Sequence, residues 1–356
     1  MKNKIKKTLI GMLALTLTFS MCACAMQTTV PEKVSSTDTN TVTEKRKIII
    51  DTDTGADDAS ALILAAKCEN IDIVGVTVLV GNVDLEQSTK NAIMALETAG
   101  CDAPVYKGAD ETFNGVKKTA FSVFGEDGMG DANLIHPKGE AEEEDAIDFI
   151  LDTVKSNPGE IEIVALGPAT NIAKAIEKDP ETMKKVKMIW SMGSAGLGPG
   201  NASPVAEFNV YADAEAYKIM LDSEIPITVI GLDMCADEAQ WTDDQFVKLS
   251  ASGETGRFVA DSFGKIREFY KNNGSETVMN CDALAMMCVT NPDFVNDRIN
   301  THASCIIEEG ETYAQVIYYK EGFTYDMAMN DFVYNVDLVT DVDKELFFEN
   351  YLNAVR

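Results

Sequence analysis

Lys-Ile-Ile-Ile-Asp-Thr-Asp-Thr-Gly-Ala-Asp-Asp, residues 47–58, is the stretch that decides how this chain folds. Its three isoleucines form a short apolar run, which is typical of a strand buried on both faces of a parallel sheet. Residues 57–68 then have the apolar spacing of a helix with one buried face. The stretch therefore predicts a strand, a turn and a helix, with four aspartates where the strand ends and the helix begins.

The rest of the chain repeats this alternation of short apolar runs and helical patterns. We expect strands at residues 71–80, 105–106, 161–166, 188–191, 227–230 and 332–339. We expect helices at residues 85–99, 142–156, 170–177, 212–221, 246–271 with a break near Gly253, 282–288 and 344–352. Residues 305–308 and 313–319 could form a hairpin around Glu309-Gly310. The pattern predicts an α/β fold: a mostly parallel central sheet, open and doubly wound, with helices on both faces and a small additional β-hairpin.

The first 45 residues differ in composition from the rest of the chain. Four lysines precede an apolar run at residues 9–19, which is too short to span a bilayer comfortably and suits the core of a signal peptide. Ala23-Cys24 follows, as in a bacterial lipoprotein signal, so we expect residues 1–23 to be removed and Cys24 to carry a lipid. Residues 24–45 are rich in Thr, Ser, Glu and Lys and predict a disordered tether. These features predict a protein held by its lipid on the extracytoplasmic face of a bacterial membrane, with plain secretion as the alternative.

The charge and the cysteines exclude some classes of function. The net charge of -28 argues against a nucleic-acid partner, because a polyanion would be repelled. Six cysteines lie outside the signal, and none of them form a Cys-x-x-Cys pair, which argues against a zinc ribbon. Cys281 and Cys288 are expected to share a helix and to lie too far apart there for a disulfide.

The four aspartates after the first strand are the strongest chemical signal. Asp51, Asp53, Asp57 and Asp58 would repel one another and raise each other's pKa values unless a cation neutralised them. The cluster contains no His or Cys, which favours an oxygen-preferring ion such as calcium or magnesium. A solvated turn with capping acids would account for Asp57 or Asp58, but not for two acids that directly follow a buried strand.

Two enzyme families place aspartates at such a position. The first segment partly resembles the haloacid dehalogenase-type phosphatases, in which Asp51 would attack phosphorus and Asp53 would act as acid and base with magnesium. In that motif, however, Gly55 stands where a Thr is usual. The segment 47–64 resembles more closely the N-terminal signature of the inosine-uridine preferring nucleoside hydrolases, Asp-x-Asp-x-Gly-x-Asp-Asp-Ala, with Thr54 in place of the usual Pro.

The resemblance to nucleoside hydrolases extends from about Lys47 to the C-terminus. Further segments match that family's motifs in order: Val80-Gly81-Asn82, Asp127 to Gly130, Leu166 to Asn171, Met192-Gly193, Gly200-Asn201, Ala206 to Asn209 with Asp213, Gly231 to Asp233, and Cys281-Asp282. It identifies residues 46–356 as one catalytic domain. The implied activity is calcium-dependent hydrolysis of the N-glycosidic bond of a ribonucleoside. A homodimer or homotetramer is the expected assembly.

The resemblance also implies roles for single residues. Asp53, Asp58 and Asp282 would bind Ca2+ through their carboxylates, and Thr170 through its backbone carbonyl. Asp53 would also take a proton from the attacking water, while Asp51 would orient the cluster from behind. The remaining polar residues would hold the water and the ribose: Asp57, Asn82, Asn201, Glu207 and Asn209. Loops within residues 110–140 and 235–275 are expected to surround the base.

The chain departs from the family at the leaving group. Many members have a His directly before the late metal-binding Asp, where it helps to protonate the departing base, but here this residue is Cys281, as in one subgroup. Cys281 is either a weaker proton donor or a small buried residue. Phe124 replaces a second familiar His, and His136 is expected at the surface. Phe208 is expected in the core, while Trp241 and Tyr325 either stack on a base or pack.

A third hypothesis gains support from the signal and from the missing His. In it the chain is a lipid-anchored nucleoside- or ribose-binding protein that has a pocket but no turnover. Calcium-dependent release of ribose would separate the hydrolase from the binding protein, and release of phosphate would indicate the phosphatase.

Overall fold

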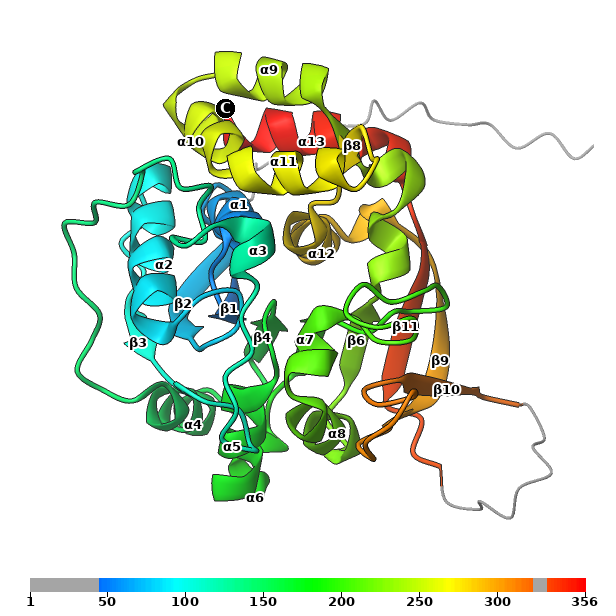
Figure 1. Cartoon of the computed structure of the whole chain (residues 1–356). Coiled ribbons are helices and arrows are strands. Elements are labelled where there is room, and N and C mark those ends of the chain that lie inside the picture. The colour runs from blue at the N-terminus through cyan, green and yellow to red at the C-terminus, as the bar shows by residue number, and fades with distance from the viewer. Residues whose placement is uncertain (1–44, 323–331) are drawn as a thin grey trace, which may run out of the picture. The chain divides into compact units, whose positions relative to one another are not determined.

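A nine-stranded sheet forms the centre of the molecule in the computed structural model, which describes residues 45–322 and 332–356 (Figure 1). The strand order is β10-β9-β11-β6-β5-β4-β1-β2-β3. The strands are β1 (Arg46–Thr52), β2 (Ile71–Val78), β3 (Val105–Lys107), β4 (Ile161–Ala165), β5 (Met188–Met192), β6 (Ile227–Ile230), β9 (Val295–Cys305), β10 (Val316–Lys320) and β11 (Val336–Val342). From β3 to β11 all neighbours are parallel, and β9 and β10 complete the sheet as antiparallel strands. The predicted α/β class is confirmed.

Helices cover both faces of this sheet, and the isoleucines of β1 show why. Ile48 and Ile50 point into one apolar core and Ile49 into the other, as the two-residue period of a strand requires. The helices are α1 (Ala56–Ala66), α2 (Leu85–Ala99), α3 (Phe121–Phe124), α4 (Ala146–Ser156), α5 (Thr170–Lys178), α6 (Pro180–Met183), α7 (Phe208–Ala212), α8 (Ala214–Asp222), α9 (Asp243–Ala251), α10 (Glu254–Ser262), α11 (Gly264–Asn272), α12 (Cys281–Thr290) and α13 (Phe347–Val355). Helices α1, α2 and α12 contribute to the first core, and α4, α5 and α8 to the second.

Several element boundaries differ from the sequence-based prediction. Helix α4 begins at residue 146 and not at 142, because the side chain of Asp145 caps it by accepting a hydrogen bond from the Ile147 N–H. The predicted hairpin exists and is formed by β9 and β10. Its first strand, β9, begins at Val295, ten residues earlier than expected. The segment predicted as helical from 246 to 271 has the break before Glu254 and a second one at Phe263. A separate two-stranded sheet joins β7 (Trp241–Thr242) to β8 (Thr277–Val278).

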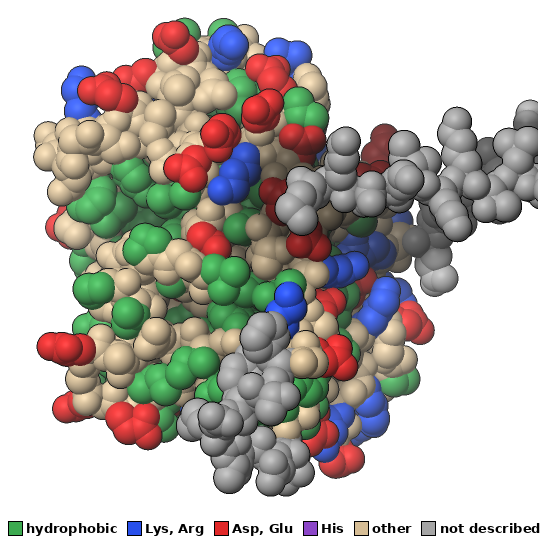
Figure 2. Space-filling view, turned by 90° about the vertical axis from the view of Figure 1, so that its right-hand side faces the viewer, with side chains coloured by type: hydrophobic (Ala, Val, Ile, Leu, Met, Phe, Trp, Pro, Cys, Tyr) green, Lys and Arg blue, Asp and Glu red, His purple; other side chains and the backbone are tan. Residues whose placement is uncertain are grey.

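The predictions for the N-terminal segment, including the signal peptide, Cys24 and the tether up to residue 44, lie outside the described residues, as does Tyr325. The described residues belong to one compact unit. Their helices are too short or too polar to cross a membrane. Figure 2 shows acidic side chains scattered over one face of the molecule, where they lie in contact with solvent.

A buried carboxylate with partly exposed cations links three strands near their amino ends. Glu162 of β4 is 1% exposed and accepts hydrogen bonds from Arg46 of β1, from Lys187 and from the indole N–H of Trp190 on β5. These donors outweigh the effect of burial and lower the pKa of Glu162 to about 2.

We expect Glu162→Gln to reduce the free energy of unfolding at pH 7 by about 2 kcal/mol, less than the linkage limit of about 3 kcal/mol because Arg46 and Lys187 reach solvent. Because the pKa in the folded state is depressed, this stability is present above the ordinary carboxyl pKa and is lost as the pH falls towards 2. Urea unfolding between pH 7 and pH 3 measures it. The difference between the wild type and the variant should shrink at acid pH; a constant difference would show that the charge of Glu162 is not its source.

Candidate active site

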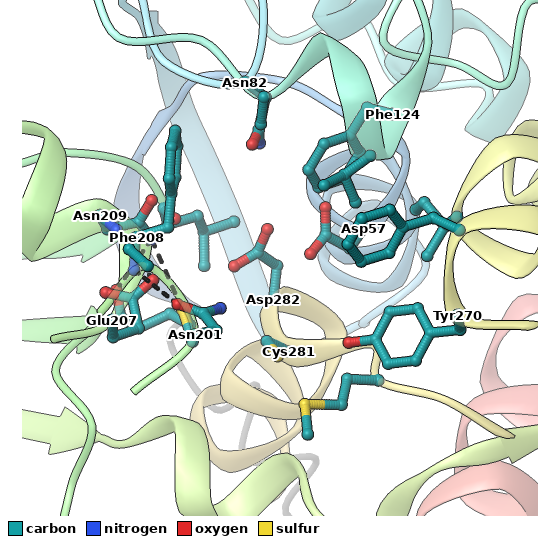
Figure 3. Close-up of a pocket in the computed structure, with 18 residues that line it drawn as sticks. Asp57, Asn82, Phe124, Asn201, Glu207, Phe208, Asn209, Tyr270, Cys281 and Asp282 are labelled. Atoms are coloured by element: carbon teal, nitrogen blue, oxygen red, sulfur yellow. Dashed lines mark hydrogen bonds between the residues drawn. The ribbon is translucent and has the colours of Figure 1, made fainter. Parts of the chain in front are cut away.

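The site lies at the carboxyl ends of the parallel strands, where the loops after β1, β2, β4 and β5 meet α7 and α12 (Figures 1 and 3). A cavity opens there, and its lining is polar on one side and apolar on the other. The polar side chains are Asp57, Asn82, Asn201, Glu207, Asn209 and Asp282. Segments far apart in the sequence thus supply one site, as expected for the switch region of an α/β sheet.

Asp53 is fully buried directly after β1, and the backbone shapes the space around it. The N–H of Asn82 donates to Oδ2 of Asp53 over 2.6 Å, and Oδ1 has no partner. A Cβ added to Gly81 would lie 2.0 Å from Oδ2, and one added to Gly167 would lie 2.7 Å from Oδ1. The two glycines therefore allow the backbone to approach both oxygens of this carboxylate.

Asp58 lies in the first turn of α1 and is held by three donors. Its Oδ1 accepts from the Thr52 hydroxyl at 2.6 Å, and its Oδ2 accepts from the Gly55 N–H and the Asn82 side chain, both at 2.9 Å. Asn82 therefore fixes two aspartates at once, one through its backbone and one through its side chain.

Asp57, Asp58 and Asp282 form a group whose ligand atoms all lie within 4.8 Å of one another. Asp282 reaches the group because α12 packs against α1, where the Ser60 hydroxyl donates to Asn280 at 3.0 Å. Oδ1 of Asp57, like Oδ1 of Asp53, is buried without a partner. Oxygen ligands with unsatisfied lone pairs suit calcium or magnesium, so the residues present fit a hard cation.

The electrostatics of this group support the same interpretation. Burial, and then repulsion by Asp58, raise the pKa of Asp57 to about 8. Burial and the neighbouring carboxylates raise the pKa values of Asp53 and Asp282 well above the usual range. Holding these groups ionised at neutral pH is unfavourable without a positive charge among them.

Asp51 and Thr170 lie behind the cavity. Asp51 accepts from the Thr77 hydroxyl at 2.6 Å and from the Asn171 side chain at 2.8 Å, and burial raises its pKa to about 7. Its predicted role of orienting the cluster stays a prediction. Thr170 starts α5, and its hydroxyl donates to Asp213 at 2.7 Å, which anchors the strand-to-helix turn.

Glu207, Asn209 and Asn201 form the polar wall opposite the aspartates, as Figure 3 shows. Glu207 caps α7 by accepting from the Asn209 N–H at 2.8 Å, and burial raises its pKa to about 7. The Asn209 side chain donates to the Leu166 carbonyl at 2.7 Å, which joins α7 to the end of β4. Asn201 is exposed at the rim and accepts from the Phe208 N–H at 2.9 Å.

The apolar wall was not identified residue by residue from the sequence. Most of it comes from α3 and α11, which lie within residues 110–140 and 235–275, and Met279 lies beyond these regions. Its members are Ala120, Val123, Phe124, Ile266, Phe269, Tyr270 and Met279. Phe208, which we expected in the core, also lines the cavity. Trp241 instead is fully buried in an aromatic cluster with Phe246 and Phe263, and His136 is exposed.

Cys281 lines the cavity next to Asp282 and is nine-tenths buried. It is hydrogen-bonded to Cys235 of the 3-10 helix Leu232–Cys235; this bond and burial raise the pKa of the Cys281 thiol well above its usual range. The position agrees with the predicted catalytic site, and its role as a proton donor stays a prediction.

Fold and site together define an α/β protein with a cavity of polar and apolar side chains beside a group of carboxylates suited to a hard cation. The family model described as inosine-uridine preferring nucleoside hydrolase matches residues 48–349. The chain belongs to this family and is an N-glycosyl hydrolase. This assignment decides against the phosphatase alternative.

Similar proteins agree with this assignment. Uridine nucleosidase 1 of Arabidopsis thaliana is 34% identical over 73% of this chain and 80% of its own length. The pyrimidine-specific ribonucleoside hydrolase RihB of Escherichia coli strain SE11 is 31% identical over 77% of this chain and 87% of its own length. Among solved structures, the plant nucleoside hydrolase PpNRh1 superposes with a TM-score of 0.82 at 28% identity, covering 87% of this chain and 98% of its own. A purine-preferring ribonucleoside hydrolase from Gardnerella vaginalis gives 0.80 at the same identity and coverage.

The glycine next to Asn82 offers a test of the geometry around Asp53. Gly81→Ala is expected to reduce nucleoside hydrolysis at least roughly 100-fold, because the new Cβ would displace the Asp53 carboxylate from its position. Gly264→Ala is the matched control, since its Cβ would come no closer than 3.8 Å to another residue. Ribose release by the two variants measures the difference. Equal activity in both would show that the backbone approach at Gly81 is not needed.

Proposed function

We propose that this protein catalyses the calcium-dependent hydrolysis of the N-glycosidic bond of ribonucleosides, giving ribose and the free base. One observation carries the proposal: three carboxylates lie within 4.8 Å of one another, and two of them, Asp57 and Asp282, line a cavity that also has an apolar wall. The polar side suits a cation and a ribose, and the apolar wall suits a planar base.

Asp53, Asp58 and Asp282 would hold the ion through their carboxylates, together with the backbone carbonyl of Thr170. A bound calcium ion supplies positive charge that makes a coordinated water more acidic and orients the ribose hydroxyls. Asp57 belongs to the same carboxylate group, and its free Oδ1 is available to a ribose hydroxyl.

Asp53 acts as the general base in this proposal. The Asn82 N–H occupies Oδ2, which leaves Oδ1 free to accept the proton of the attacking water. Loss of the base leaves an electron-poor, oxocarbenium-like ribosyl group, which the surrounding carboxylates stabilise. Asn201, Glu207 and Asn209 would orient the ribose from the opposite wall.

Release of ribose from a panel of nucleosides tests the proposal. The panel should contain uridine and inosine, because the similar proteins are named for both pyrimidine and purine substrates. The chain from residue 27 onward is assayed with calcium and with a chelator. Calcium-dependent release of ribose supports the hydrolase. No release, while nucleosides still raise the melting temperature in calcium, would instead indicate a binding protein without turnover.

We also propose, from the sequence alone, that the protein is exported and anchored by a lipid on Cys24. The full-length chain should then label with palmitate and sediment with membranes, whereas Cys24→Ala should do neither. Labelling that survives this substitution would contradict the assignment. A homodimer or homotetramer remains the expected assembly, and light scattering of the soluble chain measures it.

A further inference from the structure

The proposed reaction needs a proton for the departing base, and the cavity contains one hydroxyl on the side where the base would lie. Tyr270 is near the end of α11 and lines the apolar wall with Phe269 and Met279. Figure 3 shows its phenolic oxygen pointing into the cavity towards Cys281, and Asp57 lies nearby. Tyr270 therefore places a polar atom between the ribose side and the base side.

The hydrogen bonds of Tyr270 leave its proton available. The backbone N–H of Met279 donates to the phenolic oxygen, so the hydroxyl proton has to point elsewhere. Burial raises the pKa of Tyr270 above its usual range, which keeps the hydroxyl protonated at neutral pH.

Cys281 is in a different situation. Its thiol is hydrogen-bonded to Cys235, a buried residue that does not belong to the cavity lining. A thiol carries only one proton, so the hydrogen bond to Cys235 competes with donation of that proton to a ligand in the cavity.

We propose that Tyr270, and not Cys281, protonates the leaving base; this inference rests on the proposed function. As the water oxygen bonds to C1′, the C1′–N bond breaks and its electron pair passes to the base. The Tyr270 O–H gives its proton to a ring nitrogen or carbonyl oxygen of the base, and solvent returns a proton to the phenolate after the base has left. The proton of the water goes to Asp53.

Two substrates separate this role from a structural one. Uridine and inosine release bases that need a proton, whereas 4-nitrophenyl β-D-ribofuranoside releases a stable phenolate that needs none. Tyr270→Phe is expected to lower kcat for the two nucleosides about 100-fold and to change kcat for the nitrophenyl riboside less than about threefold. Tyr106→Phe is the matched control, because Tyr106 lies on β3 and stacks on Phe149 through its ring alone.

The outcomes distinguish this inference from the proposed function. If the wild-type protein releases no ribose from any nucleoside, the proposed function fails. The inference is overturned if the wild type is active and Tyr270→Phe lowers kcat equally for all substrates. It is also overturned if Tyr270→Phe leaves kcat for the nucleosides unchanged. Cys281→Ala gives a second comparison. We expect it to lower kcat for the nucleosides less than Tyr270→Phe does. The reverse order would identify the Cys281 thiol as the proton donor.

Discussion

Asp53→Ala should lower the rate of ribose release by roughly 10³- to 10⁴-fold, the largest effect that we expect from any single substitution. The substitution removes the free Oδ1 that would take the proton of water and one of the proposed ligands of the ion. Release of ribose from the best nucleoside of the panel, at saturating calcium, is the measurement.

Asp148→Ala serves as the control for this substitution. Asp148 lies on α4, half exposed, in a surface ion pair with Lys178, so losing its carboxylate should leave activity unchanged. An Asp53→Ala variant that keeps more than roughly a tenth of the wild-type rate would remove Asp53 from the role of general base.

Removing calcium is expected to have the second largest effect, on stability. In the metal-free protein the pKa of Asp57 is about 8 and that of Asp51 about 7, so the folded chain keeps protons that the unfolded chain releases near pH 4. Folding then takes up protons, and stability falls as the pH rises from about 4 to 8. With a chelator the melting temperature should drop by roughly 5–10 °C between pH 5 and pH 8.

Calcium should flatten this dependence, since an ion favours ionised carboxylates in the folded state and binds only there. Scanning calorimetry across this pH range, with calcium and with chelator, makes the comparison. Asp282→Asn should follow the chelated curve under both conditions. The idea fails if calcium leaves the wild-type slope unchanged.

The sequence predicted the elements that are long or fully apolar. Helix α2 spans Leu85–Ala99, and β6 spans Ile227–Ile230, as expected. The misses have a common physical cause, because they are elements that depend on tertiary contacts. β9 is mostly polar and partly exposed, so no apolar period marks its first residues. α7 has five residues and depends on the Glu207 cap, and α3 has four residues and no buried side chain.

The site shows the same division. The aspartates could be found from the sequence because four acids after a buried strand are unfavourable without a function. Phe269 and Tyr270 could not be found, because on an amphipathic helix an aromatic residue that faces a cavity looks the same as one that faces the core. Phe208 was also expected in the core, but it lines the cavity.

The docking of α12 on α1 has a kinetic consequence. Ser60 and Asn280, whose side chains meet there, are 220 residues apart, and Tyr351 of α13 also donates to the Ser60 carbonyl. A partly folded chain therefore has the aspartates of α1 without Asp282, and the proposed ion site is incomplete in it. Calcium should leave the rate of refolding almost unchanged and slow only unfolding. The ion would then bind only after the last helices have docked. It would lengthen the lifetime of the folded protein without affecting how the protein folds.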